Sequence, residues 1–272
     1  MVEGSGVVLP LKAEMISIGN ELLIGKTVNT NATWLAQRLT HLGVDVRRVL
    51  AVGDSIEEIS SSLKEALKRG PGIIITTGGL GPTYDDMTLE GVARATEVPL
   101  KVNGEALRMV RESYKHIGLQ LTPARIKMGR MPRGAKPLTN PVGTAPGCFL
   151  RLKGTFIVSL PGVPKEMQAI FDQSVAPVVA KASKGRVFGE EAFEASGIPE
   201  SGLAPLLDEV RAHHPLVYFK SHPRRPEGQP VIEFHLTSTG TDSSAVYDAL
   251  GRAAAELKEI LRKKGATVTQ AT

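Results

Sequence analysis

The residues most suited to chemistry lie in one short segment, residues 76–86, with the sequence TTGGLGPTYDD. Its glycines, Gly78, Gly79 and Gly81, allow the backbone to adopt positive φ and to approach a ligand closely. Successive N–H groups in such a loop can bind an anion, and a following helix adds partial positive charge. The segment has neither the Gly-Lys-Ser/Thr of a Walker loop nor G-x-G-x-x-G spacing. It therefore predicts a phosphate site, and the alternative is a tight strand-to-helix turn.

Two adjacent carboxylates, Asp85 and Asp86, end this segment. Neighbouring negative charges repel unless something positive lies close by. A divalent cation that bridges them to a phosphate would supply that charge, and hard oxygen ligands suit Mg²⁺ or Mn²⁺. Such a cation also activates water and stabilises a leaving phosphate. The pair predicts a metal site, and the alternative is that both residues only cap the next helix.

Three other segments could meet the glycine-rich loop: GNELL at 19–23, NPVGTAPG at 140–147 and LPGVPKEM at 160–167. The first offers the amide of Asn20 and the carboxylate of Glu21, which could instead be a capping or loop residue. Lys165 lies in the first turn of a predicted helix, where a positive charge opposes the helix dipole. An external anion is therefore its expected partner, and the alternative is a solvent-exposed lysine.

The elements that would position these residues alternate along the chain. Strands are predicted at 13–18, 44–52 and 73–75, and helices at 29–42 and from Ser55 to the Gly70-Pro71 stop. Connections of this length favour a parallel sheet with right-handed crossovers. The continuous apolar run Ile73-Ile74-Ile75 suits a strand covered on both faces. Ligands of open α/β sheets bind at the carboxyl ends of the strands, where the glycine-rich loop begins.

The rest of the chain extends this domain and adds a smaller one. The further elements expected in the first domain are helices at 88–95 and 104–117, a mixed segment at 119–147, strands at 149–150 and 156–158, and a helix at 164–179. Those expected after a linker at 182–185 are strands at 186–195, 216–220 and 231–237 and helices at 200–211 and 242–264. The organisation predicted is a lead-in at 1–12, an α/β domain at 13–181 and a small α+β domain at 186–272.

Composition excludes several classes of protein. A single cysteine, Cys148, among 272 residues rules out an internal disulfide framework, and the six histidines lack metal-ligand spacing. No apolar run reaches the roughly 18 residues of a membrane span, and no signal peptide is evident, so a cytoplasmic protein is expected. The net charge is +5, and residues 101–136 hold nine basic and two acidic residues. This local excess suggests an anionic ligand nearby or a solvated helix face.

The motifs together resemble one family. GNELLIGKTVNTNATWLAQRL, GDSIEEI, TTGGLGPTYDDMT, NPVGTAPG and LPGVPKEM occur in the order found in the N-terminal domain of the CinA (competence/damage-inducible protein) family. That domain has the molybdopterin-binding fold, and the resemblance covers about residues 13–180. It implies a three-layer α/β domain with a mostly parallel sheet. Residues 196–201 resemble the start of a small KH-like domain, and the C-terminal nicotinamide-nucleotide amidase domain of CinA is expected to be absent.

The resemblance also implies a function. The activity it implies is a metal-dependent (Mg, Mn or Co) pyrophosphatase acting on ADP-ribose or a related dinucleotide such as FAD. The alternatives are molybdopterin binding or adenylylation, and a non-catalytic nucleotide-binding module. A dimer or trimer is expected, with a small phosphorylated nucleotide as ligand and neither nucleic acid nor a membrane as partner.

Site residues follow from the resemblance position by position. Asp85 and Asp86 would hold the metal, and with Glu21 and Lys165 they form the catalytic set. The residues implied at the phosphates are Gly78, Gly79, Gly81, Pro82 and Thr83. Those implied to line the rest of the pocket are Asn20, Asn31, Gly143, Thr144, Pro161 and Gly162.

Overall fold

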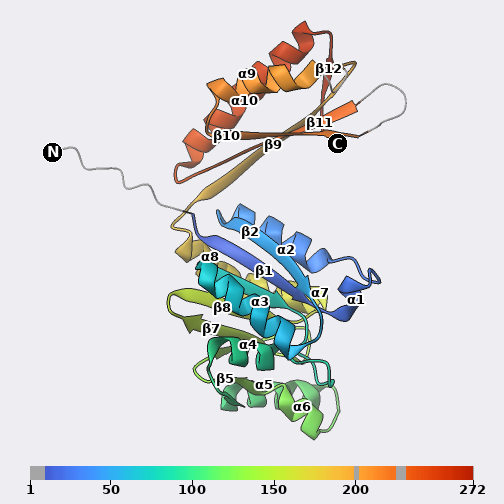
Figure 1. Ribbon diagram of the computed structural model, residues 1–272, viewed down its shortest axis with the longest axis vertical. Helices are drawn as coiled ribbons and strands as arrows, with labels where there is room; N and C mark the ends of the chain where they lie inside the picture. Colours follow the sequence, from blue (N-terminus) through green and yellow to red (C-terminus); the bar gives the residue numbers. More distant parts are fainter. Residues whose placement is uncertain (1–9, 199–201, 225–230, 272) are drawn as a thin grey trace, which may run out of the picture. The chain divides into compact units, whose positions relative to one another are not determined.

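A six-stranded sheet forms the centre of the first of two units in the computed structural model, which describes residues 10–198, 202–224 and 231–271 (Figure 1). The strand order is β2-β1-β3-β8-β7-β6. Neighbours from β2 to β8 pair in parallel. Strand β7 pairs antiparallel with β8, and β6 pairs antiparallel with β7. The strands are β1 (Lys12–Ile18), β2 (Asp45–Val52), β3 (Ile73–Thr77), β6 (Lys136–Leu138), β7 (Gly147–Leu152) and β8 (Thr155–Leu160). The expected α/β domain with a mostly parallel sheet is confirmed.

Helices cover both faces of this sheet (Figure 1). They are α1 (Asn20–Leu23), α2 (Thr30–His41), α3 (Ile56–Arg69), α4 (Thr88–Thr96), α5 (Gly104–His116), α6 (Pro123–Lys127), α7 (Pro164–Ile170) and α8 (Ala176–Ala182). On one face, Ile16 and Ile74 share an apolar cluster with Ile59 of α3 and Val110 of α5. On the other face, α2 packs against residues Phe171–Val175, which follow α7. The ring of Trp34 there lies edge-on to that of Phe171, 5.5 Å between centroids.

Local signals explain several boundaries. The Ser55 hydroxyl accepts a hydrogen bond from the Glu58 N–H and begins α3, and Gly70 ends it in the left-handed conformation. Every residue of β3 is buried, as its apolar run predicts. Cys148 is also buried, which raises the pKa of its thiol to about 12 and agrees with the role of a small apolar residue.

Two segments of the first unit differ from the sequence expectation. The single helix predicted at 164–179 is interrupted by a π-helical segment, η1 (Phe171–Val175), before α8. Pro177 lacks an N–H group, so the α-helical hydrogen-bond ladder cannot continue unchanged into that turn. The mixed segment at 119–147 contains α6, β6 and a short strand β5 (Arg130–Pro132), which pairs with β4 (Leu100–Val102).

The second unit contains residues 41–43 and those from 184 onward. Its antiparallel sheet has the order β10-β11-β9-β12, and its helices share one apolar cluster with the sheet. The elements are β9 (Val187–Ser196), α9 (Leu203–His213), β10 (Val217–Pro223), β11 (Val231–Gly240), α10 (Ser243–Lys263) and β12 (Thr267–Gln270). Phe193 and Phe234 stack at its centre, 5.2 Å between ring centroids.

The small unit also departs from expectation. Its likeness to KH domains is not confirmed, and β12, absent from the sequence prediction, completes a four-stranded antiparallel sheet by pairing with β9. The carboxylate of Asp242 caps α10 by accepting from the Ala245 N–H. Residues 199–201, where the predicted helix at 200–211 was to begin, lie outside the described residues. No helix in the described ranges is long and apolar enough to cross a membrane.

Candidate functional site

A cavity of about 430 Å³ lies at the carboxyl ends of β1, β3 and β8. This is the edge at which open α/β sheets bind ligands. Its walls come from the β1–α1 junction, the loop before α3, the glycine-rich loop, the end of α6, residues 144–145 and the β8–α7 turn. The lining residues are Ile18, Gly19, Glu21, Asp54, Gly78, Gly79, Leu80, Gly81, Pro82, Thr83, Asp85, Asp86, Met128, Thr144, Ala145, Pro161, Gly162, Val163 and Glu166.

The glycine-rich loop presents backbone donors to this cavity. Gly78 and Gly79 have φ values of +102° and +63°, which side chains rarely tolerate. A Cβ on Gly78 would lie 2.2 Å from the Ile18 carbonyl oxygen. In the part of the chain that the structure describes, the N–H groups of Gly79, Leu80 and Gly81 have no hydrogen-bond acceptor. Three successive N–H groups without an acceptor are the donors that an anion-binding concavity of backbone groups requires.

Thr83 links both acidic residues to the loop. Its N–H donates to Asp86 Oδ2 at 2.8 Å. Its hydroxyl oxygen lies 2.6 Å from Asp86 Oδ2 and also within hydrogen-bond distance of Asp85 Oδ1, so the two carboxylates share its single O–H donor. Neither aspartate caps α4, whose N-cap, Met87, makes no side-chain cap. The alternative of simple helix caps is therefore not what the structure shows.

One lysine contacts this acidic loop from outside. Nζ of Lys127, the last residue of α6, donates to the Thr83 carbonyl oxygen at 3.0 Å. The pKa of Asp85 is lowered chiefly by the Thr83 hydroxyl, then by its own backbone N–H, and also by the positive charge of Lys127. Part of the basic segment 101–136 thus reaches the site through α6.

The rim opposite the glycine-rich loop is held by reciprocal bonds. The Asn20 N–H donates to Asp54 Oδ2 at 2.8 Å, and the Asp54 N–H donates to Asn20 Oδ1 at 3.3 Å. Asn20 therefore ties α1 to the loop before α3 and does not itself line the cavity. Glu21 does line it, as expected from its place at the end of β1.

The two proline-containing segments also approach the cavity. Thr144, Pro161 and Gly162 line it, as does Glu166, which accepts from Asn140 Nδ2 at 2.6 Å. Gly143 is not in the lining; a Cβ there would collide with the Glu166 carboxylate.

Two further residues singled out from sequence lie beside the cavity and outside its lining. The Asn31 amide donates to the Gly162 carbonyl oxygen at 2.7 Å and lines a neighbouring cavity of about 90 Å³. Lys165 is exposed and has no polar partner within the described ranges.

Sequence reasoning missed four residues at or near the site. Asp54 is the aspartate of the GDSIEEI motif and Glu166 lies within LPGVPKEM, so both motifs contained a signal. Met128 and Lys127 follow no motif, and only the basic excess of 101–136 indicated that region.

The residues do not form a closed metal centre. Within the described ranges, no group of three or more His, Cys, Asp or Glu side chains is arranged to hold a metal ion. Asp85 and Asp86 are both engaged by Thr83. Magnesium commonly binds through one or two carboxylates together with water and substrate phosphates. Asp85 and Asp86 would therefore hold a magnesium ion only together with a substrate phosphate that also binds it.

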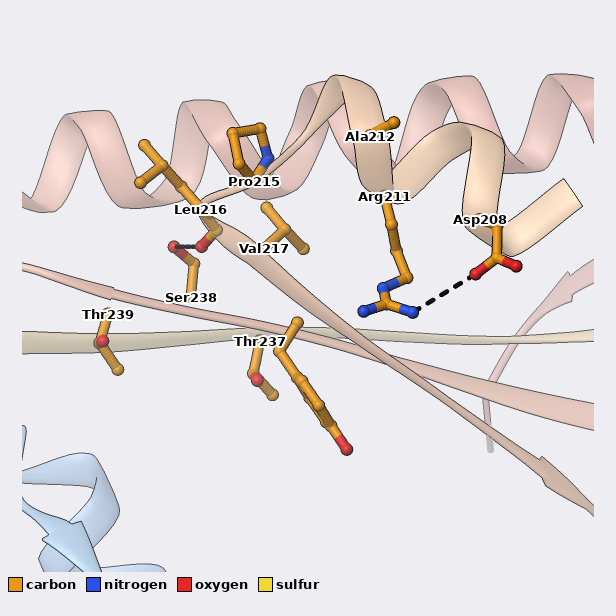
Figure 2. Close-up of a pocket in the computed structure, with 10 residues that line it drawn as sticks. Asp208, Arg211, Ala212, Pro215, Leu216, Val217, Thr237, Ser238 and Thr239 are labelled. Carbon is orange, nitrogen blue, oxygen red and sulfur yellow. Dashed lines mark hydrogen bonds and ion pairs between the residues drawn. The ribbon is translucent and has the colours of Figure 1, made fainter. Parts of the chain in front are cut away.

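A second cavity, of about 620 Å³, lies in the smaller unit between α9, β10 and β11 (Figure 2). Arg211 extends from α9 toward the sheet and is 3.4 Å from Asp208. The Ser238 hydroxyl donates a hydrogen bond to the Leu216 carbonyl oxygen at 2.9 Å. None of the residues singled out from sequence lines this groove, so the cavity at the glycine-rich loop is the candidate site.

The fold and this site define an α/β domain with a glycine-rich loop at the carboxyl edge of its mostly parallel sheet. Residues 14–181 match the family described as "Probable molybdopterin binding domain". These residues make up more than half of the chain, so the protein belongs to this family, and the family resemblance seen in the motifs is confirmed at this level.

Relatives extend over the whole chain. A protein of Pyrobaculum arsenaticum is 45% identical over 259 residues, which cover 94% of this chain and 97% of the relative. One of Aeropyrum pernix is 45% identical over 252 residues, 92% of each chain. The crystal structure of the protein CinA, of unknown function, from Thermoplasma acidophilum is similar with a TM-score of 0.58 and 41% identity. It covers 61% of this chain and 98% of that one.

Proposed function

We propose that the first unit binds a small phosphorylated heterocycle of the molybdopterin class, with its phosphate on the glycine-rich loop. The observation that carries this proposal is the row of free N–H groups from Gly79 to Gly81 at the cavity wall. Family membership supports a pterin as the heterocycle.

The rest of the cavity suits a ring. Its volume of about 430 Å³ lies within the roughly 300–1,000 Å³ typical of small-molecule sites. Leu80, Met128 and Ala145 contribute apolar surface on which a flat ring can pack, and Thr144 contributes a hydroxyl. A ligand with a phosphate at one end and a heterocycle at the other matches this division.

Titration with a matched pair of fluorescent probes tests the proposal. We expect 6-hydroxymethylpterin phosphate to bind the full-length protein at least tenfold more tightly than 6-hydroxymethylpterin, because only the phosphate can use the loop donors. Binding is followed by quenching of pterin fluorescence. Equal affinity for both probes, or no binding of either, would overturn the proposal.

Hydrolysis of a dinucleotide pyrophosphate is a second candidate, favoured by the acidic wall of the cavity. Its lining includes the carboxylates of Glu21, Asp54, Asp85, Asp86 and Glu166. Asp85 and Asp86 would hold Mg²⁺, Mn²⁺ or Co²⁺ together with the substrate phosphates, and the cation would neutralise charge on the leaving phosphate. Glu21, which lines the cavity, would be a base for an attacking water or a further metal ligand. Lys165 is not among the residues that line the cavity.

Release of AMP from ADP-ribose or FAD measures this second candidate. We expect release only with added Mg²⁺, Mn²⁺ or Co²⁺, and its loss in Asp85→Ala, which leaves the Asp86–Thr83 bonds in place. Asp208→Ala, an exposed acid in the other unit, serves as the control and should keep full activity. If no dinucleotide is cleaved while the phosphorylated pterin still binds, the domain is a binding module and hydrolysis is excluded. The dimer or trimer implied by the resemblance stays a prediction.

A further inference from the structure

The acidic wall creates an electrostatic problem for any phosphate in the cavity. Five carboxylates line it, and no lysine or arginine of the described residues does. A phosphate monoester carries up to two negative charges, which the carboxylates of the wall repel. The N–H groups of Gly79, Leu80 and Gly81 offer partial charges only. A full positive charge close to the loop is needed to favour an anion there.

Lys127 is the basic side chain that meets this requirement. Its Nζ donates to the Thr83 carbonyl oxygen at 3.0 Å, and Thr83 belongs to the cavity wall. Within the described ranges, no other lysine or arginine side chain makes a hydrogen bond or ion pair with a lining residue. Neither Lys127 nor Lys165 lines the cavity itself, but Lys165, which the sequence suggested for this role, makes no hydrogen bond to a lining residue through its side chain within the described ranges.

Local structure fixes Lys127 at this place. Thr122 caps α6 by accepting from the Arg125 N–H, Pro123 begins the helix, and Lys127 ends it. Met128, the next residue, lines the cavity. An ammonium group has three donors, and the Thr83 carbonyl oxygen uses one of them. That bond leaves two donors unused, and the ammonium charge acts on the loop, where it also lowers the pKa of Asp85.

We propose that Lys127 is the phosphate-selecting cation of this site: it holds the glycine-rich loop through the Thr83 carbonyl oxygen and offsets the charge of the bound phosphate. This inference rests on the proposed function and deepens it, because it assigns the preference for a phosphorylated ligand to one residue of α6. Lys127 is also a positioning residue for Thr83, which in turn bonds Asp85 and Asp86.

Three variants of the full-length protein test the proposal: Lys127→Met, Lys127→Arg and, as matched control, Lys101→Met. Lys101 belongs to the same basic segment but is exposed on β4 and does not line the cavity. Dissociation constants are measured for 6-hydroxymethylpterin phosphate, 6-hydroxymethylpterin and inorganic pyrophosphate. We expect Lys127→Met to weaken both phosphate-bearing probes about tenfold and to leave the neutral pterin unchanged. Lys127→Arg should recover affinity to within about threefold, and Lys101→Met should match the wild type.

Salt provides a second readout that a purely structural role would not change. Raising the salt concentration should weaken phosphate binding to the wild type more than to Lys127→Met, because the charge that is screened is absent from the variant. A variant that binds all three probes as the wild type does would overturn the inference. Equal weakening of the neutral and phosphorylated pterins would also overturn it, since it would mean that the substitution only disturbs the loop. If the wild type shows no preference for phosphate, it is the proposed function that fails.

Discussion

Gly78→Ala is expected to destabilise the first unit by about 3–5 kcal/mol and to abolish binding of the phosphorylated pterin. The backbone at Gly78 has a φ of +102°, and a methyl group there would lie 2.2 Å from the Ile18 carbonyl oxygen. Relief of that contact must separate the loop from β1, although the Gly78 N–H bonds the Leu160 carbonyl oxygen at 3.0 Å on the other side. The free N–H groups that follow would lose their arrangement.

Urea unfolding followed by tryptophan fluorescence measures this loss, because Trp34 is the chain's single tryptophan and lies in α2 of the first unit. Gly154→Ala is the matched control. Gly154 has a φ of +91° with no atom within 4 Å of an added Cβ, so its cost should be about 1 kcal/mol from the backbone alone. Similar losses for the two variants would show that the contact with β1 contributes nothing.

Glu14→Ala is expected to lower the free energy of unfolding of the same unit by about 2–3 kcal/mol. The Glu14 side chain is only 6% exposed and accepts two bonds from Arg69, from Nε at 2.8 Å and from Nη2 at 2.7 Å. Its removal leaves the partly buried guanidinium of Arg69 with only the longer contact to Glu65, 3.9 Å away. Because Arg69 is 35% exposed, water can compensate in part, which places the effect below that of a fully buried pair.

Glu112→Ala provides the comparison for this second experiment. Its partner, Arg108, lies one turn away on α5, and both side chains are 62% exposed. Exposed pairs of this kind contribute little, so the midpoint of urea unfolding should scarcely move. The interpretation of Glu14 is wrong if the two variants lose the same amount of stability.

Much of the site was predictable because its parts are contiguous motifs. The spacing of Gly78, Gly79 and Gly81 directly after an apolar strand indicated a ligand-binding loop. Parallel strands bring their carboxyl ends, and the loops that follow them, to one edge of the sheet. Contacts between distant segments could not be predicted in the same way. The bond of Lys127 to Thr83 joins α6 to a loop 44 residues earlier, and periodicity carries no information about such a pair. For Lys165 the motif indicated the region but not the position of the side chain, since the motif approaches the cavity and Lys165 is not among the lining residues.

The fold shows a similar division. Caps such as Ser55 and stops such as Gly70 act within a few residues, so the ends of α3 were readable from sequence. The π-helical segment before α8 and the strand β12 were not predicted. The π-helical segment lies just before Pro177, whose missing N–H interrupts the α-helical hydrogen bonds. Strand β12 depends on pairing with β9, about 70 residues earlier.

The sequence by itself determined the alternation of strands and helices, the place of the glycine-rich loop at the ligand edge, and the family. These follow from interactions between near neighbours along the chain and from short motifs. Tertiary structure decided which side chains face the cavity, that Asp85 and Asp86 are held by Thr83, and that Lys127 rather than Lys165 is the nearby cation. The physical reason is that charge acts through space: its effect at the site depends on distances that only the packing of α6 and α7 against the loops establishes.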